Sequence, residues 1–342
     1  MTQPIIGWDI GGAHLKLARL DGRGRVVDVA QHPCPLWRGL DRLEQLVGRV
    51  AADVDLAQHH HAVTMTGELA DIFPDLCAGV RAILDTLVGY LDGRSLHVYS
   101  VRGFRRPAPA RARPLSVASA NWHATARFVA ARLRDSLVID IGSTTTDIIP
   151  VRGGRIVTAA LSDGERLEAG TLLYAGVLRT PIMAVVNTVP FAGRWQTLAA
   201  EHFATMADVH VLTGQWSPAG ASFETADGAG VAPADCARRL ARMLGRDLDA
   251  TDIAIWRRLA AYIARRHEDA IRVAIERILI AQAHATTVVG AGVGRFLAKS
   301  IAARLGCHYH DFASLVPAPA RLRSMTAQCA PAVAVARLRY GR

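Results

Sequence analysis

The stretch PIIGWDIGGAHLKLARL, residues 4–20, contains two apolar runs separated by a glycine turn. The run lengths predict two β-strands, over residues 4–10 and 14–20, joined around Gly11 and Gly12. Because glycine has no Cβ, backbone N–H groups at such a turn can approach an anion closely. The turn taken alone predicts either an ordinary hairpin or half of a phosphate site.

A second stretch, SLVIDIGSTTTDIIPVRGGRIV at residues 136–157, repeats this organisation. An apolar run ends in Asp-Ile-Gly, a second apolar run follows, and a third comes after a Gly-Gly turn. Two halves that each begin with a β–turn–β unit indicate an internal duplication. The sequence therefore predicts an α/β protein of two lobes with a cleft between them, formed by residues 1–135 and 136–330. A final helix, residues 331–342, is expected to pack back on the first lobe.

Other segments have apolar residues at helical spacing. They predict helices over residues 39–54, 76–92, 118–134, 232–245 and 251–282. The late segment VGAGVG, residues 289–294, lies between a predicted strand and a predicted helix. A turn of this kind lets a phosphate or a sugar lie against the backbone at the helix N-terminus. No acidic residue follows at the dinucleotide spacing, so we do not expect a Rossmann site.

The two turns and the late loop together predict a binding site for a diphosphate. Backbone N–H groups, hydroxyls and the ammonium of Lys16 would neutralise the phosphates, and carboxylates would orient a hydrated Mg²⁺. The candidate diphosphate ligands are Gly11, Gly12, His14, Gly142, Ser143, Thr144, Thr145, Gly290 and Gly292. The candidate magnesium ligands are Asp9, Asp140 and Asp147.

Composition indicates a globular protein, with 51% hydrophobic and 20% charged residues among 342. No apolar run is long enough to span a membrane, and the first residues lack a leader pattern. Five cysteines lie far apart, which predicts reduced thiols. We therefore expect a cytoplasmic protein that does not contact a membrane.

The net charge of +10 comes from arginines scattered along the chain, with only two lysines, Lys16 and Lys299. The one dense basic segment, residues 102–114, is expected to be a solvated surface loop. The histidines at residues 59–61 are likewise expected to form a surface run. We expect small-molecule substrates and no nucleic-acid partner, and the sequence predicts no particular oligomeric state.

The paired Asp-Ile-Gly turns and the late glycine loop, in this order, resemble the actin / sugar-kinase / heat-shock ATPase superfamily. This resemblance implies two RNase-H-like lobes around a cleft. Three segments are more specific: TMTGEL (64–69), ASANWHATA (118–126) and VIDIGSTTTDI (138–148). They resemble the hydantoinase A/oxoprolinase branch, and within it the methanofuran (methylofuran) synthase group of tetrahydromethanopterin-linked one-carbon metabolism.

The resemblance implies a transferase reaction that needs no ATP. An aminomethylfuran-methanol diphosphate loses pyrophosphate, and the phenol oxygen of a tyramine or tyrosine acceptor, often glutamylated, takes its place. Asp9, Lys16, Glu68 and Asp140 are the candidate catalytic residues, with Glu68, His14 or His123 as the base for the phenol.

Three neighbouring residues are candidates for substrate binding: Asn121, Trp122 and His123. Trp122 would stabilise positive charge at the furfuryl carbon, or simply fill the core. Asn121 would bind polar substrate groups, or cap a helix.

Two other functions fit the same turns. One is an ATP-dependent enzyme of this fold, either a small-molecule kinase or a hydantoinase/oxoprolinase-like hydrolase. Full-length hydantoinases and oxoprolinases are much longer, which weighs against ring-opening hydrolysis. The other is a non-enzymatic nucleotide-binding protein, which would not need the TMTGEL and ASANWHATA segments.

Overall fold

The computed structural model describes residues 3–218, 224–248, 253–282 and 287–341. The chain forms two compact units. Unit 1 comprises Met1–Val138, Ile149–Glu165 and His310–Arg342, and unit 2 comprises Ile139–Ile148 and Arg166–Tyr309. The lobes of residues 1–135 and 136–330 stay a prediction.

Unit 1 is built around a six-stranded sheet with the order β3-β2-β1-β4-β5-β6. Its strands are β1 (Ile5–Ile10), β2 (His14–Leu20), β3 (Val26–Pro33), β4 (His60–Met65), β5 (Leu96–Ser100) and β6 (Gly103–Arg105). Strand β1 runs antiparallel to β2 and parallel to β4. Every residue of β1 is buried, because the sheet is covered on both faces.

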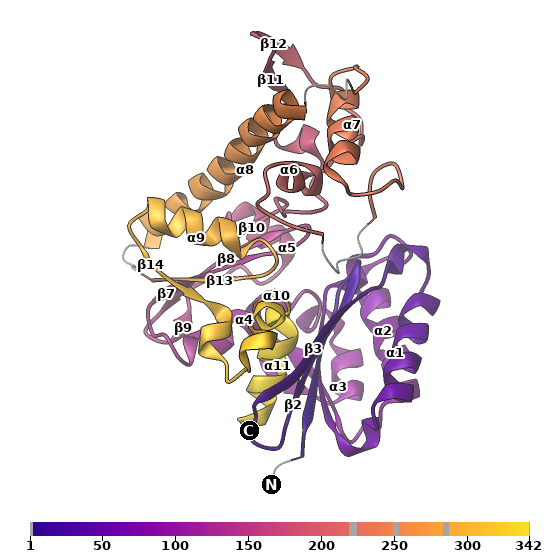
Figure 1. Cartoon of the computed structure of the whole chain (residues 1–342). Coiled ribbons are helices and arrows are strands. Elements are labelled where there is room, and N and C mark those ends of the chain that lie inside the picture. Colours follow the sequence, from indigo (N-terminus) through magenta and orange to yellow (C-terminus); the bar gives the residue numbers. More distant parts are fainter. Residues whose placement is uncertain (1–2, 219–223, 249–252, 283–286, 342) are drawn as a thin grey trace. The chain divides into compact units, whose positions relative to one another are not determined.

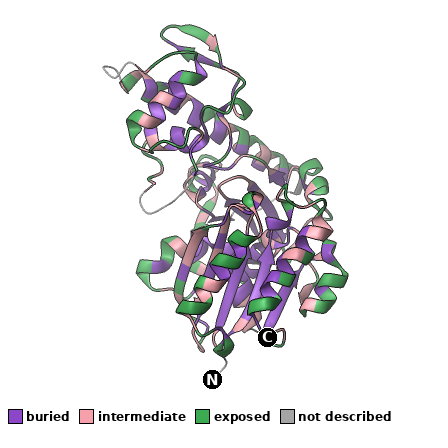
Figure 2. Cartoon of the chain, turned by 90° about the vertical axis from the view of Figure 1, so that its right-hand side faces the viewer, coloured by how far each residue is buried: buried purple, intermediate pink, exposed green. Residues whose placement is uncertain are grey.

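Helices cover both faces of this sheet, with α1 and α2 on one side and α4 and α11 on the other (Figure 1). The helices of unit 1 are α1 (Asp41–Asp53), α2 (Leu76–Tyr90), α3 (Pro107–Ala112), α4 (Asn121–Ala130), α10 (Arg323–Gln328) and α11 (Ala330–Tyr340). Figure 2 shows buried strands between helices whose outer sides are exposed. Helix α11 lies so close to β1 that a Cβ on Gly7 would be 2.0 Å from the carbonyl oxygen of Ala332.

The second sheet has the order β10-β8-β7-β13-β14, with β9 paired to β8. Its strands are β7 (Ser136–Ile141), β8 (Thr146–Arg152), β9 (Arg155–Ile156), β10 (Leu172–Leu173), β13 (Thr287–Ala291) and β14 (His308–Asp311). This order matches β3-β2-β1-β4-β5 of the first sheet, with β7 in the place of β1. The predicted α/β fold of two related halves is therefore confirmed.

The rest of unit 2 consists mainly of helices and one hairpin. These elements are α5 (Asp163–Glu168), which begins in unit 1, α6 (Met206–Leu212), α7 (Pro233–Met243), α8 (Ile253–Gln282), α9 (Arg295–Arg304), β11 (Thr188–Phe191) and β12 (Arg194–Thr197). Residues 251 and 252 of the predicted fifth helix lie outside the described residues. None of the described helices has the length and apolar character that crossing a bilayer requires.

Two segments differ from their predicted structure. The basic segment 102–114 contains strand β6 and helix α3 instead of an irregular loop, and Pro107 begins that helix, a position where proline is favoured. The helix predicted over 118–134 begins only at Asn121, because Ser119 has a left-handed backbone (φ +49°) that a helix cannot contain.

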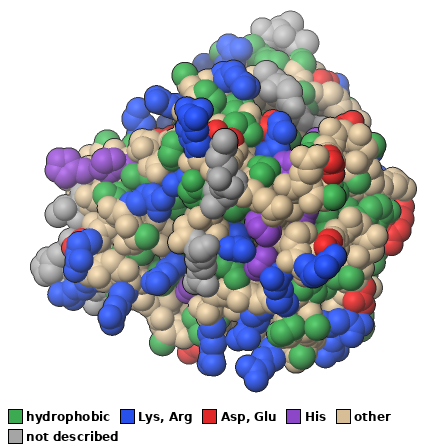
Figure 3. All heavy atoms as spheres, turned by 90° about the horizontal axis from the view of Figure 1, so that it is seen from below, with side chains coloured by type: hydrophobic (Ala, Val, Ile, Leu, Met, Phe, Trp, Pro, Cys, Tyr) green, Lys and Arg blue, Asp and Glu red, His purple; other side chains and the backbone are tan. Residues whose placement is uncertain are grey.

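On the face drawn in Figure 3, Lys and Arg side chains form separate groups with hydrophobic side chains between them.

The histidines at residues 59–61 are not a surface run. His61 is only 1% exposed; its Nδ1 accepts a hydrogen bond from Trp8 Nε1 at 3.2 Å, and its Nε2 lies 3.0 Å from the Leu56 carbonyl oxygen. The prediction was wrong because β4 is an interior strand of a sheet covered on both faces, so alternation does not bring His61 to solvent.

Candidate functional site

A backbone hydrogen bond between Gly11 and His14 closes the first glycine turn, and a second bond ties the turn to Leu36. The Gly11 N–H donates to the His14 carbonyl oxygen at 2.9 Å, and the Gly12 carbonyl accepts from the Leu36 N–H at 2.9 Å. His14 is the first residue of β2. A Cβ placed on Gly12 would meet no described atom within 4 Å, so the space beside this residue is open. This leaves the backbone at Gly12 accessible to an anion.

Asp9 and Lys16 face each other across β1 and β2. They are register partners, and Lys16 Nζ lies 3.2 Å from Asp9 Oδ2. The Asp9 side chain is 2% exposed and that of Lys16 is 24% exposed. In such a pair the ammonium can turn to an arriving phosphate, and the carboxylate can turn to an arriving cation.

The second glycine turn repeats the first in geometry. The Gly142 N–H donates to the Thr145 carbonyl at 2.8 Å, which is the equivalent of the Gly11–His14 bond. The Ser143 carbonyl accepts from the N–H groups of Leu178 and Arg179, at 3.1 and 2.8 Å. The hydroxyls of Ser143 and Thr144 lie 3.4 Å apart. The turn is thus held by the segment after β10.

The late glycine loop lies against Asp140. Gly292 has a φ of +82°, and a Cβ there would be 2.5 Å from Asp140 Oδ1 and 2.2 Å from the Ile141 carbonyl oxygen. The Gly294 N–H donates to that carbonyl at 2.8 Å. Gly290 packs against the ring of Tyr309. Unit 2 therefore brings two sequence-predicted segments, the second turn and the late loop, to one carboxylate.

Asp147, the third candidate magnesium ligand, already has a cation at its carboxylate. Arg166 Nη2 lies 2.6 Å from Asp147 Oδ1 and also donates to the Thr171 carbonyl at 3.0 Å. The side chains of Arg166 and Asp147 are 2% and 13% exposed. A metal at Asp147 would compete with this buried arginine, so the contact opposes the predicted metal role. Sequence reasoning missed Arg166, because it lies in a polar segment without a motif.

The TGEL segment is attached to the first glycine turn. Its Thr66 N–H donates to the Ile10 carbonyl at 2.9 Å, and Gly67 packs against the carbonyls of Ile10 and Gly11. Glu68 follows in a short 3-10 turn and is 1% exposed. Its Oε1 accepts from the Ser119 N–H at 2.6 Å. Burial raises the pKa of the Glu68 carboxyl to about 7.

The Asn-Trp-His segment forms the first turn of α4. Asn121 is its first residue, and its Oδ1 accepts from the Trp122 N–H at 2.7 Å. Trp122 is 1% exposed, as core packing requires. His123 Nδ1 lies 2.9 Å from the Tyr99 hydroxyl. Burial, with a contribution from Arg127, lowers the pKa of His123 to about 4.

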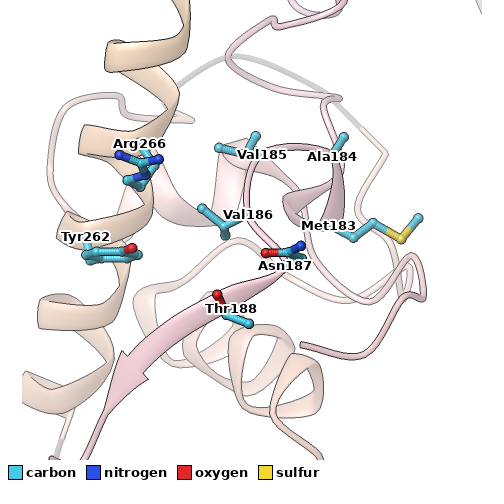
Figure 4. A pocket seen from close by; sticks show the side chains of 8 residues that line it. All are labelled: Met183, Ala184, Val185, Val186, Asn187, Thr188, Tyr262 and Arg266. Atoms are coloured by element: carbon cyan, nitrogen blue, oxygen red, sulfur yellow. The ribbon is translucent and has the colours of Figure 1, made fainter. Parts of the chain in front are cut away.

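Unit 2 also contains a cavity of about 330 Å³ that no sequence-predicted site residue lines (Figure 4). It lies between the start of β11 and the middle of α8. Its lining residues are Met183, Ala184, Val185, Val186, Asn187, Thr188, Tyr262 and Arg266.

The two sheets of matching order, each with a glycine turn after its first strand, define an α/β protein with the actin-like fold. The nucleotide-free structure of acetone carboxylase is similar in fold, with a TM-score of 0.55 at 8% identity, over 89% of this chain and 67% of that chain. The hydantoinase/oxoprolinase family model matches residues 59–340, and the chain belongs to this family.

Two curated relatives carry the same name, (4-{4-[2-(gamma-L-glutamylamino)ethyl]phenoxymethyl}furan-2-yl)methanamine synthase. The protein from Methanocaldococcus jannaschii is 35% identical over 245 residues, which cover 71% of this chain and 72% of that protein. The protein from Methanococcus vannielii is 32% identical over 125 residues, covering 36% of this chain and 56% of that protein. These matches confirm the predicted family and the prediction that the chain is an enzyme.

Proposed function

We propose that the protein is the transferase that forms an aryl ether in methanofuran or methylofuran biosynthesis. It joins an aminomethylfuran-methanol diphosphate to the phenol of a tyramine or tyrosine acceptor and releases pyrophosphate. The observation that carries the proposal is the position of Glu68, a buried carboxyl attached to the first glycine turn through Thr66. The name that the two relatives share describes a phenoxymethyl furan with a glutamylated ethylamine, and this supports the same product.

We assign phosphate binding to the glycine turn of each unit taken by itself. In unit 1 the open backbone at Gly12 and the ammonium of Lys16 would bind phosphate oxygens. In unit 2 the Ser143 and Thr144 hydroxyls would do so. Donors that are already in place stabilise the charge that develops on a leaving diphosphate without further reorganisation.

The carboxylates beside the turns fit magnesium. In the part of the chain that is described, no three His, Cys, Asp or Glu side chains gather into a metal cluster. Mg²⁺ needs no such cluster, since it keeps several waters and takes one or two carboxylates plus phosphate oxygens. Asp9 would be such a carboxylate in unit 1 and Asp140 in unit 2, and each is the fifth residue of a six-residue strand before a turn. When bound, the ion would neutralise charge on the departing pyrophosphate.

Glu68 is the best base for the acceptor. As the phenol oxygen forms its bond to the furfuryl carbon, the carbon–diphosphate bond breaks with its electron pair on pyrophosphate, and the phenol proton passes to Glu68. A carboxylate whose conjugate acid has a pKa near 7 accepts this proton better than an imidazole with a pKa near 4. His123 is therefore the weaker candidate.

The test is turnover without ATP. Purified protein, Mg²⁺, an aminomethylfuran-methanol diphosphate and either tyramine, tyrosine or γ-glutamyltyramine are mixed. We expect pyrophosphate release together with an aryl ether, identified by mass spectrometry. Product that forms only with ATP, or a phosphorylated acceptor, would contradict the transferase and favour the kinase or hydrolase alternative.

A further inference from the structure

Glu68, Ser119 and Asp163 form a contact chain in unit 1. Ser119 Oγ lies 3.2 Å from Glu68 Oε1 and 3.2 Å from Asp163 Oδ2. The three residues come from the 3-10 turn after β4, the segment before α4, and the start of α5. Ser119 therefore stands between two carboxyl groups that are far apart in the sequence.

The backbone at Ser119 is fixed in a costly conformation. A left-handed φ is unfavourable for a residue with a side chain, and Ser119 has a φ of +49°. This geometry directs its N–H to Glu68 Oε1 at 2.6 Å. Strain of this kind persists where the surroundings over-determine it, and it often marks a functional position.

The backbone of Glu68 is fixed as well. Helix α2 packs directly on it, since a Cβ on Gly79 would lie 2.7 Å from the Glu68 carbonyl oxygen. The backbone that carries the carboxyl is therefore held in place. Its second oxygen, Oε2, is buried and has no protein hydrogen-bond partner among the described residues.

A count of hydrogens shows that the Glu68–Ser119–Asp163 contact chain has a place for one proton besides the hydroxyl hydrogen. A serine hydroxyl has one hydrogen and can donate it to only one of the two carboxyl groups. If both carboxyls were ionised, the other contact would place a carboxylate oxygen against a hydroxyl oxygen with no hydrogen between them. Glu68 is the carboxyl that takes up this proton, because it is almost fully buried, whereas Asp163 is only half-buried.

The pKa of Glu68 depends on few groups. Burial raises it most, the backbone N–H groups of Glu68 and Ser119 and the Ser119 hydroxyl lower it, and the negative charge of Asp163 raises it. Asp163 is the one charged side chain among these groups.

We infer that Ser119 and Asp163 are positioning residues that set the proton affinity of Glu68, so that the three side chains share one exchangeable proton. The source of this proton, the phenol of the acceptor, rests on the proposed function. Asp163 makes Glu68 a stronger proton acceptor, and Ser119 holds the carboxyl in place.

The experiment titrates the carboxyl groups of the full chain by infrared difference spectroscopy without substrate. We expect one carboxyl that titrates near pH 7 and disappears in Glu68→Gln. Asp163→Asn should move this titration to lower pH by about one unit, because a neighbouring negative charge is lost. Ser119→Gly keeps the N–H and tolerates the left-handed backbone, but removes the hydroxyl that stabilises the ionised form. It should move the titration to higher pH.

Opposite shifts are not expected of residues that only support the fold. Glu168 is an exposed residue on the same helix as Asp163. The Glu168→Gln variant is therefore the matched control and should leave the titration unchanged. If Asp163→Asn does not fold, the Ser119→Gly shift decides. A Glu68 that titrates like an ordinary glutamate, or that ignores both substitutions, would overturn the inference. Absent turnover with these shifts intact would instead contradict only the proposed function.

Discussion

At the scale of single residues, Lys16 has the clearest assigned task. It is one of two lysines in a chain whose other basic residues are arginines. An ammonium is a compact charge that approaches a phosphate without the planar geometry of a guanidinium. Lys16 lies partly buried beside Asp9, whereas Lys299 is exposed on α9. Lys299 can therefore serve as the control for the loss of a lysine.

We predict that Lys16→Met lowers kcat/KM for pyrophosphate release by about 100-fold or more, the loss typical of removing one charge-stabilising donor. Lys299→Met should leave it unchanged. Because the substitution also removes one ion-pair partner of the buried Asp9, thermal unfolding of both variants shows whether the fold is retained. Equal activity in the two folded variants would remove Lys16 from the site.

At the scale of elements, the late loop between β13 and α9 depends on one glycine. Gly292 combines a positive φ with no room for a Cβ beside Asp140 and Ile141. Gly193, in the β11–β12 hairpin, has a similar φ of +78° but open space around it. An alanine at Gly193 would meet backbone strain alone, whereas an alanine at Gly292 would meet both backbone strain and steric collision.

We predict that Gly292→Ala destabilises the protein clearly more than Gly193→Ala. Both variants incur the left-handed cost of about 1–2 kcal/mol, but only Gly292→Ala also displaces Asp140. Free energies of unfolding from urea titrations measure the difference, and activity should fall only in Gly292→Ala. Equal losses in the two variants would show that the loop adapts and that Asp140 is not held by it.

The sequence predicted those elements whose signals are local. Turns at Gly11 and Gly142, and the strands around them, follow from adjacent residues, and each turn closes within four residues. Ser119 and Asp163 could not be found this way, because the Ser119–Glu68 contact spans 51 residues and the Ser119–Asp163 contact spans 44. His61 was misplaced because burial of an interior strand depends on the helices that cover it.

At the scale of the whole molecule, buried histidines make stability depend on pH. Burial lowers the pKa of His61, His97, His123 and His267 to about 4, and that of His210 to about 3. An unfolded histidine titrates near 6.5. The unfolded chain therefore binds more protons than the folded chain between these values. Glu68 acts in the opposite direction, since its folded pKa is raised, but it is one group against five.

We predict that the free energy of unfolding is maximal above about pH 6.5 and falls as the pH decreases toward 4. His210 and His267, whose rings lie 5.8 Å apart in unit 2, should contribute to this slope. The double variant His210→Gln/His267→Gln is expected to show a shallower dependence in urea titrations at several pH values. His308→Gln, at an exposed position, serves as control; an unchanged slope in the double variant would contradict the assignment.

The contact between Gly7 and Ala332 has a consequence for how the protein is made. After a ribosome has made β1, the helix that covers it, α11, emerges only more than 300 residues later. Until then, one face of β1 and β2 has no native cover, and non-local closure of this kind is slow. Nascent chains of this protein are therefore expected to engage chaperones on that face until α11 has emerged.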